Sequence, residues 1–255
     1  MNDVTDQGVG ERMTLVGHLD ELRRRIIYAL VGLAAGIAAA LMLGRQIVDF
    51  LRYPYTQAME AANQQPDLSV LNHMAGLIIY LKTAMATGLI IASPWIFYHV
   101  WMFVSAGLYP KERRGVMFIV PFSAALFIVG ALFFVFVVAV PVLSFLISVN
   151  NWLGLEMRIT FDSHVTLMAR MALVFGLAFQ TPLAVLILGR VGLVSLKMLH
   201  QYRRHVVIGI LISAALLTPP DPVSQLCLAV PLWLLYELGV LLVWLLAPRA
   251  KERVD

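Results

Sequence analysis

Three charged residues, Lys82, Arg170 and Glu237, lie inside long apolar stretches of this sequence. An ionisable side chain in such a stretch is costly and marks a candidate functional site. The chemistry open to these groups is the transfer or the pairing of charge. Their positions place Arg170 and Glu237 within roughly 6 Å in depth by helical rise. An Arg170–Glu237 ion pair and independent extension of Arg170 towards water are therefore both open.

Two further carboxylates stand among basic residues. Glu21 precedes Arg24 and Arg25 by three and four positions, the spacing at which ion pairs form on a helix surface. Glu112 lies within a Lys-Glu-Arg-Arg segment, where its simplest role is to neutralise a basic loop. Spacing alone gives neither carboxylate a function.

Catalytic motifs are absent from the sequence. It contains no Walker A segment, no His-Glu-x-x-His and no Gly-x-Ser-x-Gly, and Cys227 is its only cysteine. The six histidines are scattered without the spacing of metal ligands. We therefore expect no enzymatic activity, no cofactor and no metal, and expect any work to draw on partners or on a transmembrane gradient.

The composition is that of a membrane protein. Of the 255 residues 60% are hydrophobic and only 13% are charged, against about 25% charged in an ordinary soluble domain. The mean hydropathy is +0.83. Such a chain has too little polar surface for a soluble fold of this size, which excludes a nucleic-acid-binding domain, a disordered protein and a secreted disulfide scaffold.

Stretches with few charges predict an all-α fold with six transmembrane helices. A span needs about 20 apolar residues, and the fifth stretch has 13, so we expect the fifth and sixth spans to be short or to cross a thin bilayer. The prolines at 219, 220 and 222 exclude a merger of these two spans. The predicted spans are Ile26–Leu43, Gly76–Val104, Val116–Val149, Ser163–Leu188, His205–Leu217 and Leu226–Ala247.

Basic residues alternate across these six spans. Alternate extramembrane segments, beginning with the N-terminal one, hold 14 Lys and Arg, and the remaining segments hold three. The positive-inside rule then predicts that both termini are cytoplasmic. We expect a single membrane domain over residues 1–255, with a cytoplasmic amphipathic segment at 1–25, an outer cap at about 44–75 and a cytoplasmic tail at 248–255.

Small residues and prolines indicate how the spans are shaped. Gly32-x-x-x-Gly36 predicts a close helix contact. Prolines inside the spans favour bends that could enclose a concave groove, although membrane helices also tolerate proline without such a role. These residues are Pro94, Pro121, Pro141, Pro182 and Pro231.

Five ordered segments resemble the TatC family, the multi-span receptor subunits of the twin-arginine protein translocase. The first is His18-Leu19-Asp20-Glu21-Leu22-Arg23-Arg24-Arg25, and the second is Pro94 with Tyr98-x-x-Trp101-x-Phe103. The others are Leu108-Tyr109-x-x-Glu112-Arg113-Arg114, Phe175-Gly176-x-x-Phe179-x-x-Pro182 and Thr218-Pro219-Pro220-Asp221-x-x-Ser224-Gln225. They extend from the N-terminal segment to the sixth span.

The resemblance implies a binding site for signal peptides that carry two consecutive arginines. Glu21, Glu112 and Phe103 match the family residues of that site, and two carboxylates suit the planar donor forks of two guanidinium groups. Thr218 and Gln225 match positions that dock TatA-type and TatB-type single-span subunits, although Thr218 could instead cap a helix. Gln180 stands where many relatives have Glu, which leaves a polar role but removes a buried charge.

The resemblance further implies a bacterial cytoplasmic membrane protein that assembles TatA and TatB around folded precursors. The energy source would be the protonmotive force, and the receptor complex would contain several copies of this chain and no nucleic acid. One alternative is a proton-coupled transporter of small solutes that uses Lys82, Arg170 and Glu237. A membrane insertase is another.

Overall fold

The computed structural model describes residues 15–66, 68–69, 73–106, 110–155, 159–217 and 222–246. These residues are helical apart from short connections and one isolated parallel β-bridge between Ser69 and Thr160. The helices are α1 (Leu15–Met42), α2 (Gly44–Ala61), α3 (Ala75–Ala106), α4 (Pro110–Phe133), the π-helix η1 (Phe134–Val138), α5 (Ala139–Trp152), α6 (Phe161–Ala178), α7 (Thr181–Arg190), α8 (Leu196–Gln201), α9 (Arg203–Leu217) and α10 (Pro222–Leu246). The predicted all-α class is confirmed.

Five helical segments of the described residues are long and apolar enough to cross a membrane. They are Gly17–Met42, Ala75–Ser105, Ile119–Trp152, Phe161–Arg190 and Pro222–Leu246. The predicted fifth span is α9, whose 15 residues extend only about 22 Å, less than the roughly 30 Å of a hydrocarbon core. By length the structure thus supports five full spans and one short helix. The expectation of a short sixth span is wrong, because α10 has 25 residues.

The structure differs from two further expectations about the N-terminal part of the chain. The amphipathic segment and the first span form one continuous helix, α1, rather than two elements. The connection after this span is mostly helical, since α2 occupies Gly44–Ala61 with Pro54 inside it. The first 14 residues and the predicted tail at 248–255 lie outside the described residues.

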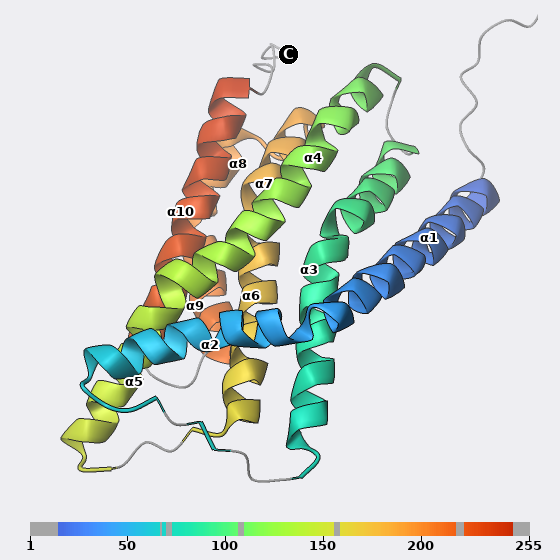
Figure 1. Cartoon of the computed structure of the whole chain (residues 1–255). Helices are drawn as coiled ribbons and strands as arrows, with labels where there is room; N and C mark the ends of the chain where they lie inside the picture. The colour runs from blue at the N-terminus through green and yellow to red at the C-terminus, as the bar shows by residue number, and fades with distance from the viewer. Residues whose placement is uncertain are drawn as a thin grey trace, which may run out of the picture.

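The helices form a bundle crossed by α2 (Figure 1). The first turns of α1 and the last turns of α10 lie on the upper side of the view, and α2 runs across the lower side. On that lower side the amide of Gln64 donates to the side-chain oxygen of Asn151 at 2.9 Å. Buried His164 of α6 contacts the carbonyl oxygen of Leu51 through Nε2 at 2.9 Å, which anchors α2 to the bundle.

Glycine permits the close packing of α1 against α3. A Cβ added at Gly36 would lie 2.5 Å from the carbonyl oxygen of Gly88, and one added at Gly88 would lie 2.6 Å from Cα of Ile37. The backbones are therefore in direct contact, where any side chain would force them apart. The close contact predicted from Gly32-x-x-x-Gly36 is confirmed.

A π-helix interrupts the third span. In η1 the N–H of Ala139 donates to the carbonyl of Phe134, five residues earlier. Pro141 has no N–H to offer the carbonyl of Val137, so a regular α-helix would lose a hydrogen bond at this point. Between positions 123 and 147 every fourth side chain is buried, namely Ser123, Phe127, Ala131, Val135, Ala139, Leu143 and Ile147.

The other prolines affect the helices unequally. Pro94, Pro121 and Pro231 remain inside the continuous helices α3, α4 and α10. Pro182 lies in the first turn of α7, directly after the break at Phe179 and Gln180 that divides the fourth span. Among the described spans, proline thus coincides with a full helix break in the fourth span and with a π-helix in the third.

We predict that Gly36→Leu separates α1 from α3. Overpacking of a tight contact typically costs about 1–3 kcal/mol, and here the obstacle is backbone that cannot rotate away. The variant should accumulate poorly in membranes and should unfold at a lower temperature in detergent. Gly209→Leu is the matched control, because the space around Gly209 in α9 is open. Equal stability of the two variants would contradict the packing described here.

Candidate functional site

One candidate site lies where the N-terminal end of α1 meets the C-terminal end of α3. The ring of His18 stacks on the ring of Phe103 with centroids 4.5 Å apart. One turn further along α1, the Arg25 guanidinium contacts Oε1 of Glu21 through Nε and Nη2, both at 2.7 Å. The structure thus brings predicted residues Glu21 and Phe103 to the same helix pair, and it confirms that Glu21 pairs with an arginine four residues later.

A buried histidine completes this group. Nη1 of Arg25 lies 3.5 Å from Nδ1 of His99, which is only 5% exposed. Tyr28 stacks on the imidazole at 5.4 Å, and Trp95 meets it edge-on at 4.8 Å. The indole N–H of Trp95 also donates to the carbonyl of Tyr28 at 2.8 Å, which fixes the α1–α3 register beside the histidine. His99 is not among the residues that the sequence motifs single out, although its ring contacts the Arg25 guanidinium from the neighbouring helix.

Two predicted site residues cannot be compared with the others. The backbone of Glu112 belongs to the first turn of α4, but its side chain lies outside the described part of the structure. Thr218 also lies outside the described residues.

Gln180 joins the fourth span to the third. Its Oε1 accepts a hydrogen bond from the Ser123 hydroxyl at 2.5 Å, and its Nε2 donates to the Ser123 carbonyl at 2.9 Å. Ser123 is fully buried in α4, and Gln180 lies at the break between α6 and α7. A neutral amide satisfies both partners at once, because it offers a donor and an acceptor where an ionised carboxylate offers acceptors only.

Lys82 has a partner that the sequence analysis did not identify. Its ammonium group lies 2.8 Å from a carboxylate oxygen of Asp162 and donates to the Thr166 hydroxyl at 3.3 Å. Asp162 belongs to the first turn of α6, one residue before the predicted fourth span begins. A carboxylate so close to a span boundary is within reach of a long lysine side chain.

Glu237 also pairs with a residue other than the one expected. Its carboxylate accepts a hydrogen bond from Nη2 of Arg203 at 2.6 Å, whereas Arg170 is exposed on α6. The Arg170–Glu237 pairing is therefore wrong. Positions 203 and 237 are equally distant from position 220, in the proline-rich segment that joins α9 to α10. Because α9 is short, Arg203, which precedes the predicted fifth span, lies at the depth of the middle of α10.

Other polar contacts join α10 to the preceding helices. The amide of Gln225 donates to the carbonyl of Leu211 in α9 at 3.1 Å. Tyr236 donates its hydroxyl hydrogen to the carbonyl of Leu199 in α8 at 2.8 Å. Gln225 is therefore engaged within the chain as well as being a candidate for partner contact.

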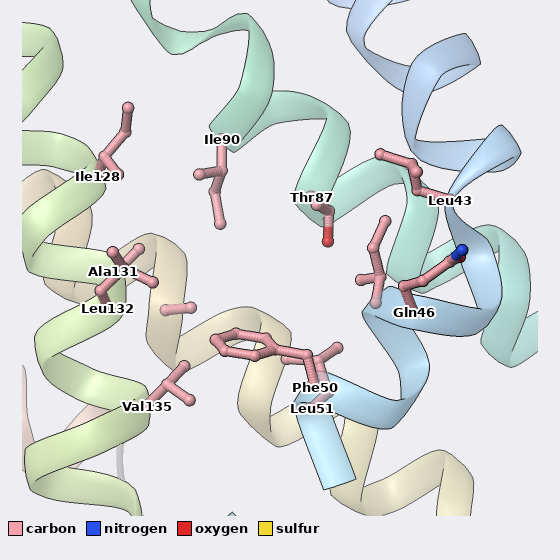
Figure 2. Close-up of a pocket in the computed structure, with 12 residues that line it drawn as sticks. Leu43, Gln46, Phe50, Leu51, Thr87, Ile90, Ile128, Ala131, Leu132 and Val135 are labelled. Atoms are coloured by element: carbon pink, nitrogen blue, oxygen red, sulfur yellow. The ribbon is translucent and has the colours of Figure 1, made fainter. Parts of the chain in front are cut away.

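A groove opens between α2, α3 and α4, although none of the five prolines inside the spans lines it (Figure 2). It has a volume of about 270 Å³ and is lined almost wholly by apolar side chains, including Phe50, Ile90 and Leu132. Gln46 and Thr87 are its polar residues. None of the predicted site residues lines this groove.

Comparison with known proteins decides the family. Residues 17–231 match the family model described as "Sec-independent protein translocase protein (TatC)". The chain belongs to the TatC family. It is 33% identical over 242 residues to TatC of Koribacter versatilis, covering 94% of this chain and 89% of that protein. It is 35% identical over 244 residues to TatC of Deinococcus radiodurans, covering 94% and 90%.

A solved structure agrees. The crystal structure of the twin-arginine translocase receptor TatC matches with a TM-score of 0.78 and 29% identity, covering 89% of this chain and 98% of that one. This TatC chain is therefore a multi-pass membrane protein with the TatC fold. As a component of the Sec-independent translocase it is a transport receptor and not an enzyme.

We predict that the Arg203–Glu237 pair behaves as a unit. Glu237→Ala leaves the Arg203 guanidinium without its carboxylate, and because the two side chains are 42% and 25% exposed we expect a loss of about 1 kcal/mol. Adding Arg203→Ala should restore part of the thermal stability, whereas adding Arg170→Ala should not. Thermal unfolding of the purified variants in detergent measures this. Additive losses in the Arg203→Ala/Glu237→Ala double variant would contradict the pairing.

Proposed function

We propose that this TatC chain binds twin-arginine signal peptides of folded precursors at the cytoplasmic ends of α1, α3 and α4. The observation that carries the proposal is the contact of Glu21 with Arg25, because a carboxylate held at 2.7 Å from two guanidinium nitrogens has the geometry that a signal arginine requires. Phe103, stacked on His18, offers an apolar surface one turn away. Glu112 would supply the second carboxylate.

Family membership supports the remaining steps. TatA-type and TatB-type subunits would dock near Thr218 and Gln225, and polar side chains between membrane helices are suitable contacts for a single-span partner. Gln180, hydrogen-bonded to Ser123, would keep the third and fourth spans in register. Several copies of the chain would assemble in the receptor complex, and the protonmotive force would drive export.

The transporter alternative has less support. It requires charged residues that are free to bind a solute or a proton, yet Lys82 lies 2.8 Å from Asp162 and Glu237 lies 2.6 Å from Arg203. Of the three candidates, Arg170 is the one that is exposed and has no salt-bridge partner among the described residues. Translocase family membership also favours the receptor.

We predict that signal binding depends on the carboxylates. Glu21→Gln and Glu112→Gln should each weaken crosslinking of a twin-arginine signal peptide to the chain in membranes, because an amide lacks the charge that a guanidinium pairs with. Glu60→Gln is the matched control, since Glu60 is exposed and belongs to α2, which lies far from the first turns of α1 in Figure 1. Unchanged crosslinking in the Glu21→Gln/Glu112→Gln double variant, at normal protein levels, would refute the proposal.

The proposed location is the bacterial cytoplasmic membrane, with both termini and the α8 region in the cytoplasm and α9 crossing as a short span. In a Cys227→Ala background, Gln65→Cys should react with a membrane-impermeant maleimide in intact cells. Gln201→Cys should react only after permeabilisation. Both positions are exposed, so reagent access is not limited by burial. Labelling of both from one side would contradict this topology.

A further inference from the structure

Arg25 occupies the carboxylate that the proposed function assigns to the signal peptide. Both partners of the Glu21–Arg25 pair are about four-fifths covered, with side-chain exposures of 22% and 21%. Water therefore screens this pair less than it screens a typical exposed i,i+4 pair. An arriving guanidinium must compete with one that already lies 2.7 Å from Oε1.

A second acceptor for the same guanidinium lies on α3. Nη1 of Arg25 is 3.5 Å from Nδ1 of His99. Because a guanidinium can only donate, this contact requires the imidazole to be neutral with its proton on Nε2. Nε2 is buried and has no hydrogen-bond partner among the described residues. The rings of Tyr28 and Trp95 hold the imidazole from two sides, so the acceptor is fixed while the arginine side chain can move.

We propose that Arg25 is an internal competitor for Glu21 and that His99 holds it when a signal arginine takes its place. This inference rests on the proposed function. The exchange replaces one Glu21–guanidinium contact by another and tightens the long Arg25–His99 contact. This competition also favours arginine over lysine in the signal peptide. A lysine ammonium is a point charge, yet it must displace the planar Arg25 guanidinium, which places two donors on Oε1 of Glu21. Discrimination thus comes partly from a competitor that the wrong ligand cannot displace.

Neighbouring arginines provide a control. Arg23 is exposed on the same helix, and removal of its charge changes the long-range field as removal of Arg25 does. Arg24 is less suitable as a control. Its guanidinium lies 5.7 Å from the centroid of the Tyr28 ring, and Tyr28 stacks on His99, so a change at Arg24 would also affect the surroundings of the imidazole. Arg25→Gln and Arg23→Gln therefore form a matched pair.

The test measures binding of labelled twin-arginine and twin-lysine signal peptides to the purified full chain in lipid nanodiscs. Arg25→Gln should bind the twin-arginine peptide about two- to fivefold more tightly than Arg23→Gln does, as expected for removal of one partly covered ion pair. The twin-lysine peptide should gain more, so the ratio of the two affinities should fall. Arg25→Lys should give a smaller gain in affinity for the twin-arginine peptide. This variant replaces Arg25→Gln in the test if Arg25→Gln does not fold.

The role of His99 is tested separately. His99→Phe keeps a ring between Tyr28 and Trp95 but removes the acceptor, so it should weaken twin-arginine binding severalfold. In the Arg25→Gln background the same change should have no effect, because nothing remains for His99 to hold.

Other outcomes overturn the inference. If Arg25→Gln binds no more tightly than Arg23→Gln, or more weakly, Arg25 orients Glu21 rather than competing for it. If His99→Phe has the same effect with and without Arg25, the imidazole does not act through the arginine. Failure of the proposed function looks different: the unsubstituted chain would then bind both peptides equally, and Glu21→Gln would not change that binding.

Discussion

Contact between the backbones of α1 and α3 is the constraint on which the candidate site depends. Gly36 and Gly88 bring the two helices together without intervening side chains. From that contact outward, the separation of the helices is set by the residues between them, first Trp95 beside Gly32 and then His99 beside Tyr28. Phe103 and His18 meet at the end of this series. The site is therefore positioned by a packing contact several turns away from it.

Polar and charged side chains also link the helices of the bundle. Lys82 and Asp162 join α3 to α6, Arg203 and Glu237 join α9 to α10, and an uncharged Ser123–Gln180 pair joins α4 to the fourth span. Each link connects segments that are distant in sequence or separated by a turn. In each ion pair the carboxylate lies less than 3 Å from its cation, so the pair links its two helices in one register.

Local patterns in the sequence predict those features that depend on neighbours along the chain. Apolar runs predict six spans, of which five are full-length helices and one is the short α9. Gly32-x-x-x-Gly36 predicts a close contact, and the spacing of Glu21 and Arg25 predicts their pair. Partners on different helices are not fixed by such patterns. Depth counted from span ends offered Arg170 as one possible partner of Glu237, whereas the observed partner is Arg203, because α9 is too short for that count to hold. The motif match located Glu21 and Phe103 but gave no sign of His99.

The buried side of the third span has a consequence for its neighbours. One stripe of buried residues recurs every four positions from Ser123 to Ile147, a longer repeat than the 3.6 residues of an α-turn, and Ala124, Phe134 and Val138 are buried beside it. In a straight α-helix such a stripe would wind about 240° around the axis; the wider turn of η1 takes up part of this. The stripe faces α3 and α6 along α4, and α2 and α10 along α5. The third span therefore changes neighbours along its length, and η1 lies where its buried side passes from one pair of helices to the other.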